Sequence, residues 1–110
     1  MDLLTFPNVR IVGMHFRGAD AKEAAAGLQP GQPLRLEREP ENQFDGNAIK
    51  VYFEDLWLGY VEASQAAWIA PNMDEDRLFT CTVQEVTEEV NGRGKINYIP
   101  LVEITEVESA

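Results

Sequence analysis

The chain has few of the residues on which metal sites, disulfide bonds and membrane spans depend. Its 110 residues include one cysteine, Cys81, and one histidine, His15. A lone cysteine has no partner within the chain, and a lone histidine excludes a metal site built from several histidines. No apolar run approaches the roughly 18 residues that a membrane span requires. With no basic leader or apolar segment at Met1–Leu4, we expect a cytoplasmic protein that needs no metal or other cofactor.

Basic residues are also scarce. Nine Lys and Arg stand against 19 Asp and Glu, which gives a net charge of −10 and a pI near 4.4. This balance argues against a protein that binds duplex DNA through many phosphate contacts. The deficit is uneven, because residues 1–50 hold six basic and seven acidic residues, whereas residues 51–110 hold three and twelve. An anionic ligand is therefore expected to prefer the first half.

The length and the absence of linkers and repeats predict one domain over residues 1–110. Residues 34–38 alternate apolar with charged side chains, and Asn91-Gly92 is a strong hairpin signal between two long β-type segments. Asp20 and Glu23 resemble a helix-capping box, and Pro71 is expected to end a second helix. Strands are expected at 9–16, 34–38, 48–53, 57–61, 78–90 and 95–107, and short helices at 20–27 and 63–70. This content predicts a mainly β (α+β) fold, a small, partly open barrel of about six strands with two short helices.

Phe44 stands out because it is the one aromatic in the polar loop 41–47, beside Asp45 and Gly46. The ring either packs into the core above an ordinary turn, or it is exposed and stacks on a base while the carboxylate accepts a hydroxyl hydrogen bond. His15 is likewise either a stacking ring or an ordinary surface histidine. Cys81 alternates with two apolar residues and is expected to be a core thiol. No nucleophile and base or paired carboxylates stand out, so we expect no enzymatic activity.

Several short motifs occur together between Gly31 and Val61. They are Arg38-Glu39-Pro40, Asn42-x-Phe44-Asp45-x-Asn47-Ala48-Ile49 and Leu58-Gly59-Tyr60-Val61. With Val12-Gly13 and Phe16 before them, they resemble the HIRAN domain over about residues 9–75, while the acidic hairpin at 77–108 matches no motif. The resemblance implies an OB-like or SH3-like β-barrel, found alone in bacteria and phages or fused to DNA-remodelling enzymes. In the fused enzymes this domain captures the 3′ ends of single-stranded DNA.

The resemblance also implies which residues contact DNA. Asp45 would accept the 3′-hydroxyl, Phe44 would stack on the terminal base, and Asn42 would hold the loop or the terminal nucleotide. His15 and Phe16 would take the places of two aromatics in the family's first strand. Met14 occupies the position of a DNA-contacting arginine in eukaryotic members, and Lys50 would meet a phosphate. The implied DNA-binding set is Met14, His15, Phe16, Asn42, Phe44, Asp45 and Lys50.

The expected function is a non-catalytic module that binds single-stranded DNA 3′ ends or stalled-fork-like DNA, in the service of DNA repair. Stacking supplies roughly 1–3 kcal/mol per base, so micromolar or weaker affinity is expected. The alternative is an acidic protein-binding or inhibitory module, of the kind that phages encode, that engages a basic DNA-processing partner. Basic groups around Phe44 and Asp45 would favour DNA, whereas acidic neighbours would favour a protein partner.

Overall fold

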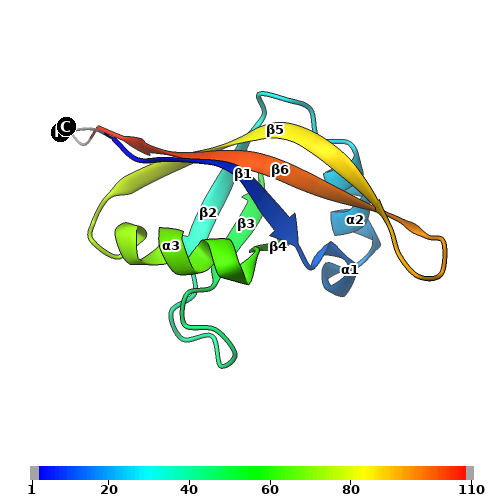
Figure 1. Ribbon diagram of the computed structural model, residues 1–110, viewed down its shortest axis with the longest axis horizontal. Helices are drawn as coiled ribbons and strands as arrows, with labels where there is room; N and C mark the ends of the chain where they lie inside the picture. Colours follow the sequence, from blue (N-terminus) through cyan, green and yellow to red (C-terminus); the bar gives the residue numbers. More distant parts are fainter. Residues whose placement is uncertain (1–2, 109–110) are drawn as a thin grey trace.

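The computed structural model describes residues 3–108 (Figure 1). Its described part is mostly β, as expected, with a one-turn helix besides the two that were predicted. The strands are β1 (Thr5–Val12), β2 (Pro33–Arg38), β3 (Ile49–Phe53), β4 (Leu56–Val61), β5 (Leu78–Val90) and β6 (Ile96–Val107). The helices are α1 (Met14–Arg17), α2 (Ala19–Ala26) and α3 (Ala63–Met73). Within 3–108, no helix has both the length and the apolar character that crossing a membrane requires.

The six strands form a closed barrel in the order β1-β4-β3-β2-β5-β6, with every neighbouring pair antiparallel. The barrel is therefore closed and not partly open. Two short ladders close it, one pairing the end of β1 with the end of β4 and the other pairing the start of β2 with β5. The ladder between β5 and β6 runs from Leu78–Val107 to Val90–Ile96, and this long hairpin extends beyond the barrel (Figure 1).

The core fills the barrel with side chains that alternate along the strands, as expected for sheets with one wet face. Ile11, Ile49, Leu58 and Ile104 are fully buried within it. Cys81 is buried among them, and burial raises the pKa of its thiol to about 12. The prediction of a core thiol is confirmed.

The chain leaves β1 in a different conformation from the one that we predicted. Gly13 has a φ of +88°, in the left-handed region that favours glycine, and the chain then forms the single turn of α1. The Phe16 amide donates to the Gly13 carbonyl at 3.0 Å. The expectation of a strand over residues 9–16 is thus wrong from Gly13 to Phe16, because Gly13 takes a left-handed conformation and the apolar and aromatic residues after it suit either structure.

Two predicted helix boundaries also differ. Helix α2 begins after Gly18 with no side-chain cap, so the capping box expected at Asp20 does not form. Helix α3 continues through Pro71 to Met73. Proline cannot donate a backbone hydrogen bond within the helix. The side-chain amide of Asn72 donates to the Trp68 carbonyl at 2.9 Å, which supports this last turn.

Candidate nucleic-acid interface

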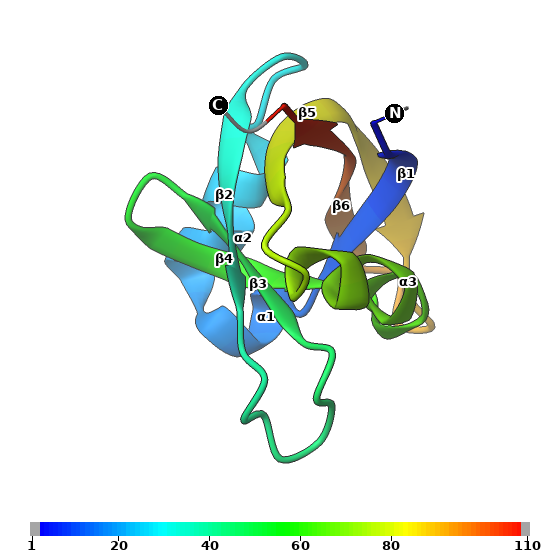
Figure 2. The ribbon, with the colours of Figure 1, turned by 90° about the vertical axis from the view of Figure 1, so that its left-hand side faces the viewer.

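The loop of residues 39–48 joins β2 to β3 and protrudes from the barrel (Figure 2). Asn42 organises it from inside. Its Oδ1 accepts hydrogen bonds from the Phe44 amide at 2.9 Å and the Asp45 amide at 3.0 Å, and its Nδ2 donates to Glu39 at 2.5 Å. The first two contacts fix the loop backbone and the third joins the Asn42 side chain to that of Glu39, so Asn42 acts on the position of its neighbours.

Glu39 anchors the base of the same loop. Its carboxylate accepts a hydrogen bond from the Tyr60 hydroxyl at 2.9 Å and pairs with the Lys50 amino group at 2.8 Å. The hydrogen bond from Lys50, followed by that from Asn42, lowers the pKa of Glu39 to about 2. Lys50 is therefore engaged within the protein, and the free phosphate contact expected of it has a competing partner.

Arg38 clamps the other side of the loop. Its guanidinium donates to the carbonyls of Ala48 at 2.6 Å and Gly46 at 2.8 Å, and it binds both carboxylate oxygens of Asp74 at 2.9 and 3.0 Å. This ion pair lowers the pKa of Asp74. Contacts of Glu39 and Arg38 thus fix both ends of the loop in the free protein.

The rigid loop presents Phe44 to solvent with 96% of the residue exposed. The interpretation in which this ring packs into the core is therefore wrong. Asp45, beside it, is half-buried, and its Oδ1 accepts a hydrogen bond from the Asn47 amide at 2.9 Å. Among residues 3–108, no donor reaches the second carboxylate oxygen. An exposed ring and an available hydrogen-bond acceptor consequently lie side by side.

Phe44 and Asp45 border a groove of about 590 Å³ between the loop, α1 and the start of α3. Phe16 and Asn42 also line it, so the structure brings four of the seven predicted residues together. Phe16 is 73% exposed. Arg17 adds a positive charge, with its guanidinium 3.8 Å from the centre of the Trp57 ring.

The other three predicted residues lie elsewhere. Met14 is only 5% exposed and packs mainly in the core; it lines the same hollow as His15, but its side chain offers a surface ligand little contact. Lys50 is paired with Glu39, as described above. His15 is exposed and lies in a second hollow of about 230 Å³, with its ring centre 3.9 Å from that of Phe16.

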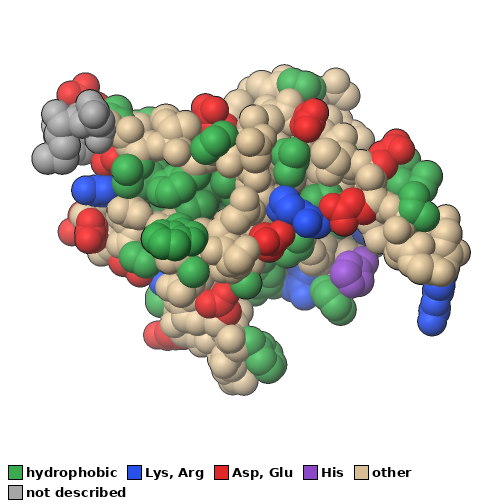
Figure 3. All heavy atoms as spheres, in the orientation of Figure 1, with side chains coloured by type: hydrophobic (Ala, Val, Ile, Leu, Met, Phe, Trp, Pro, Cys, Tyr) green, Lys and Arg blue, Asp and Glu red, His purple; other side chains and the backbone are tan. Residues whose placement is uncertain are grey.

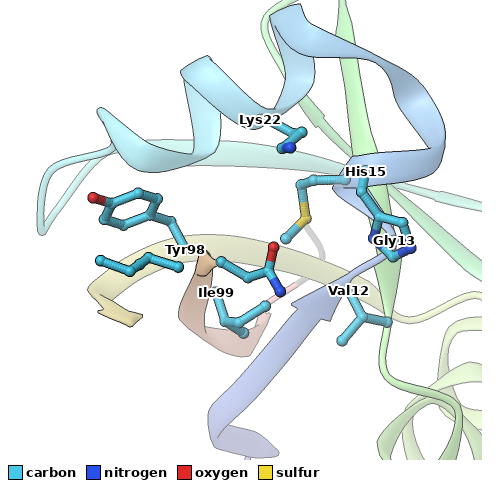
Figure 4. Close-up of a pocket in the computed structure, with 9 residues that line it drawn as sticks. Val12, Gly13, His15, Lys22, Tyr98 and Ile99 are labelled. Carbon is cyan, nitrogen blue, oxygen red and sulfur yellow. The ribbon is translucent and has the colours of Figure 1, made fainter. Parts of the chain in front are cut away.

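This second hollow lies between α1, α2 and β6 (Figure 4). Lys22, His15 and Tyr98 line it from these three elements. Val12 lines both the hollow and the groove, so the two depressions adjoin at the end of β1. The pair forms one extended surface.

Arg17 and Tyr60 are groove residues to which the sequence assigned no role. The sequence shows Arg17 only as one of the basic residues of the first half, and its position depends on a helical turn that the sequence does not predict. Tyr60 belongs to the Gly-Tyr-Val motif, and its hydroxyl ties that motif to the loop through Glu39. In the described part of the chain, no three His, Cys, Asp or Glu side chains are grouped so that they could hold a metal ion.

The protein is thus a small closed β-barrel of the binding-module type. Its loop presents an aromatic ring and a carboxylate beside an open groove. The family model of the HIRAN domain matches residues 6–98, and the chain therefore belongs to the HIRAN domain family. A crystal structure of a protein from Lactobacillus plantarum is similar, with a TM-score of 0.69 and 23% identity over 96% of this chain and 98% of that one. The crystal structure of the HIRAN domain of human HLTF is also similar, with a TM-score of 0.67 and 18% identity over 93% of this chain and 74% of that one. No curated protein matches the sequence.

Proposed function

We propose that this chain is a non-catalytic module that binds the 3′ end of single-stranded DNA and so directs a DNA-repair activity to it. The observation that carries the proposal is the loop itself, which holds the exposed Phe44 ring next to the free oxygen of Asp45. Membership of the HIRAN family supports a nucleic-acid ligand.

Single-stranded DNA fits the groove better than a duplex does. Phe44 and Phe16 are both largely exposed on its walls. Aromatic rings stack on unpaired bases, which duplex DNA hides inside its own stack, and each such contact is worth roughly 1–3 kcal/mol. Two stacked bases predict micromolar or weaker binding, in keeping with a targeting role.

A carboxylate in this position favours an end over an internal segment. Asp45 repels a phosphate but accepts a hydrogen bond from a hydroxyl group. A terminal 3′-hydroxyl on the nucleotide stacked against Phe44 would therefore be tolerated, whereas a 3′-phosphate would not. Arg17 lies on the same groove and supplies the charge for the preceding phosphate, and His15 lies in the hollow that the next nucleotide would reach.

The test is a fluorescence-anisotropy titration at low salt with a short 5′-labelled oligothymidine and its 3′-phosphorylated twin. The unmodified strand is expected to bind about tenfold more tightly, because the phosphate places two like charges together. Asp45→Asn keeps the acceptor for Asn47 and is expected to remove most of this difference between the two ends. Asp55→Asn, in the exposed turn between β3 and β4, is the matched control and should leave the difference intact.

Equal binding of both strands to the wild-type protein would remove the role of Asp45 and leave a general single-strand binder. Absence of binding to either strand at about 1 mM protein, the affinity that two stacked bases give at about 2 kcal/mol each, would overturn the proposal.

One observation favours the second candidate function, a module that engages a basic partner protein. The outward face of α3 carries Ala67, Trp68 and Pro71, which are uncharged and exposed, and Trp68 is 76% exposed. A hollow of about 240 Å³ between Trp68 and the start of β1 adjoins this face. Acidic residues bracket the helix, with Glu62 before it and Asp74, Glu75 and Asp76 after it.

This arrangement fits a segment with an apolar anchor flanked by lysine or arginine. Panning of a random peptide library on the wild-type protein, with counter-selection on Trp68→Glu, tests it. Enriched peptides that combine an apolar anchor with basic residues, and that bind less tightly as salt rises, would support the partner function. Acidic peptides, or none that depend on Trp68, would count against it.

A further inference from the structure

The free positive charges of this acidic protein are gathered on one side. Five of its nine Lys and Arg form ion pairs within 4.0 Å, among them Arg38 and Lys50 at the loop. Within residues 3–108, four lack such a pair: Arg17, Lys22, Arg93 and Lys95. They come from α1, from α2 and from the turn between β5 and β6. Acidic residues neutralise the cations everywhere else.

These four cations lie along the extended surface, in a path that runs from the groove through the hollow to the hairpin turn. Arg17 lines the groove, and Lys22 lines the adjoining hollow together with His15. The far wall of that hollow is the start of β6, from Ile96 to Ile99. Ile96 directly follows Lys95, so the hollow continues onto the turn of the hairpin. On the lower edge of Figure 3, the single histidine, in purple, lies between Lys and Arg atoms on either side.

The turn that carries the outer two cations has a defined shape. The Asn91 side chain accepts hydrogen bonds from the amides of Arg93 at 2.8 Å and Lys95 at 3.0 Å. Of the three basic residues in the second half of the chain, these two have no acidic partner among the described residues 3–108. The acids of α2 do not interrupt the path, because Asp20 and Glu23 line a different hollow beside Phe53. Two acids do lie near it, since Glu88 and Glu89 on β5 are paired in register with Tyr98 and Asn97, and of these Glu89 forms an ion pair with Arg10.

We propose that the tip of the β5–β6 hairpin is a second anchor, which binds backbone phosphates of the same DNA strand several nucleotides before its 3′ end. This inference rests on the proposed function for the direction of the strand. The strand would run from the groove, past His15 and Lys22, to Arg93 and Lys95. The Phe44 loop would then make binding selective for a free 3′ end, and the hairpin tip would make it selective for longer strands.

A comparison of two 5′-labelled oligothymidines with free 3′ ends, a trinucleotide and a decanucleotide, tests the second anchor. Ten nucleotides reach about 34 Å even when fully stacked, against a longest molecular dimension of 46 Å. The decanucleotide is expected to bind about tenfold more tightly at low salt. Its log affinity should fall more steeply with log salt, by about 1.4 in slope for two added phosphate contacts.

The double variant Arg93→Gln, Lys95→Gln should reduce decanucleotide binding to the level of the trinucleotide and leave the trinucleotide unaffected. Arg35→Gln removes one cation on β2, where the exposed guanidinium stacks on Tyr52, and should change neither affinity. Glu88→Gln removes the nearby acid that forms no ion pair with a described residue, and it is expected to tighten binding of the decanucleotide alone by about twofold.

The outcomes separate the two proposals. If the trinucleotide binds but the decanucleotide binds no more tightly, the proposal of a second anchor is wrong and the proposed end site stands. If the decanucleotide depends on Arg93 and Lys95 but not on its 3′ end, the anchor stands and the end site is wrong. If neither strand binds, both proposals fail.

Discussion

Phe44 and Glu39 belong to one loop and make opposite contributions to it. The Phe44 ring is almost wholly in solvent, so folding gains nothing measurable from it. The Glu39 carboxylate joins Asn42, Lys50 and Tyr60 and holds the loop in place. The proposed ligand contact of Phe44 and the positioning role of Glu39 can therefore be told apart by whether a substitution changes binding or stability.

Phe44→Ala should weaken binding of a short oligothymidine by about tenfold, the loss of one stacked base. Its free energy of unfolding should stay within about 0.5 kcal/mol of the wild type, as for other surface substitutions. Urea unfolding and fluorescence anisotropy on the same preparation check both expectations. Leu78→Ala, which also removes an exposed apolar side chain but lies outside the groove, should change neither quantity. A destabilised Phe44→Ala variant would show that the ring packs against the protein in solution.

Glu39→Gln should lower the free energy of unfolding at neutral pH by about 1–2 kcal/mol, a range that allows for solvent screening of a partly exposed network. Folding lowers the pKa of Glu39 from 4.5 to about 2, so the folded protein binds this proton less readily than the unfolded chain. Its stabilising effect is therefore complete above 4.5 and is lost as the pH falls towards 2. The difference between wild type and variant should shrink over that interval.

Urea unfolding at neutral pH and at two acidic pH values measures this difference. Glu41→Gln is the matched control, because Glu41 is exposed in the same loop and forms no ion pair with a described residue. A difference between Glu39→Gln and wild type that stays constant down to the lowest pH would contradict the network described here.

At the scale of elements, the meeting of β1 and β4 positions both depressions. Gly59 on β4 lies so close to β1 that a Cβ atom built on it would be 2.2 Å from the Val12 carbonyl oxygen. Val12 lines the groove and the hollow, and the chain turns into α1 directly after it. The Gly-Tyr-Val motif therefore combines a close strand contact with the tyrosine that binds Glu39.

Gly59→Ala should destabilise the fold by about 3 kcal/mol, because the obstructing atom belongs to the backbone and the ladder has to shift. Gly92→Ala is the control, since a Cβ there meets nothing within 4 Å and the residue has no positive φ. It should stay within about 0.5 kcal/mol of the wild type. Urea denaturation measures the free energy of unfolding of both variants. If Gly59→Ala were as stable as Gly92→Ala, strands β1 and β4 could move apart at Gly59 at little energetic cost.

The elements that the sequence predicted correctly are those with a local signal. Alternation defines residues 34–38, and Asn91-Gly92 marks the hairpin whose turn Asn91 caps. The start of β1 was missed because Asn8 adopts a φ of +57° and the register shifts between Phe6 and Val9. The sequence predicts strand where helix α1 forms, since the apolar residues of a single turn carry no helical periodicity. The position of Arg17 depends on that turn and was beyond sequence reasoning.

The candidate site was predicted in composition but not in arrangement. The motif around Asn42 identified the loop and its ring, and the structure shows why the loop is rigid. The pairing of Lys50 with Glu39 depends on register between β2 and β3. A residue-by-residue charge count does not reveal which cations are neutralised, and Lys50 was therefore counted as free.

At the scale of the whole molecule, the net charge of −10 conceals four cations that form no ion pair within residues 3–108. The unpaired cations lie along the groove, the hollow and the hairpin turn, while paired ones hold the loop and the helices. Long-range repulsion by the acidic surface opposes any polyanion that cannot align with this path. The arrangement thus favours a thin, flexible strand over a broad duplex.

A blunt-ended duplex should accordingly bind at least about tenfold more weakly than the same duplex extended by a ten-nucleotide 3′ overhang. The duplex doubles the charge density that the acidic surface faces and withholds its bases from Phe44 and Phe16. Competition of both duplexes against a labelled oligothymidine, in fluorescence anisotropy at low salt, gives the ratio. A 5′ overhang of equal length carries the same unpaired bases but a recessed 3′ end, so its affinity should fall between the two. If the blunt duplex competed as well as the 3′ overhang, overall charge would not shape what this protein binds, and a surface outside the groove would have to hold the duplex.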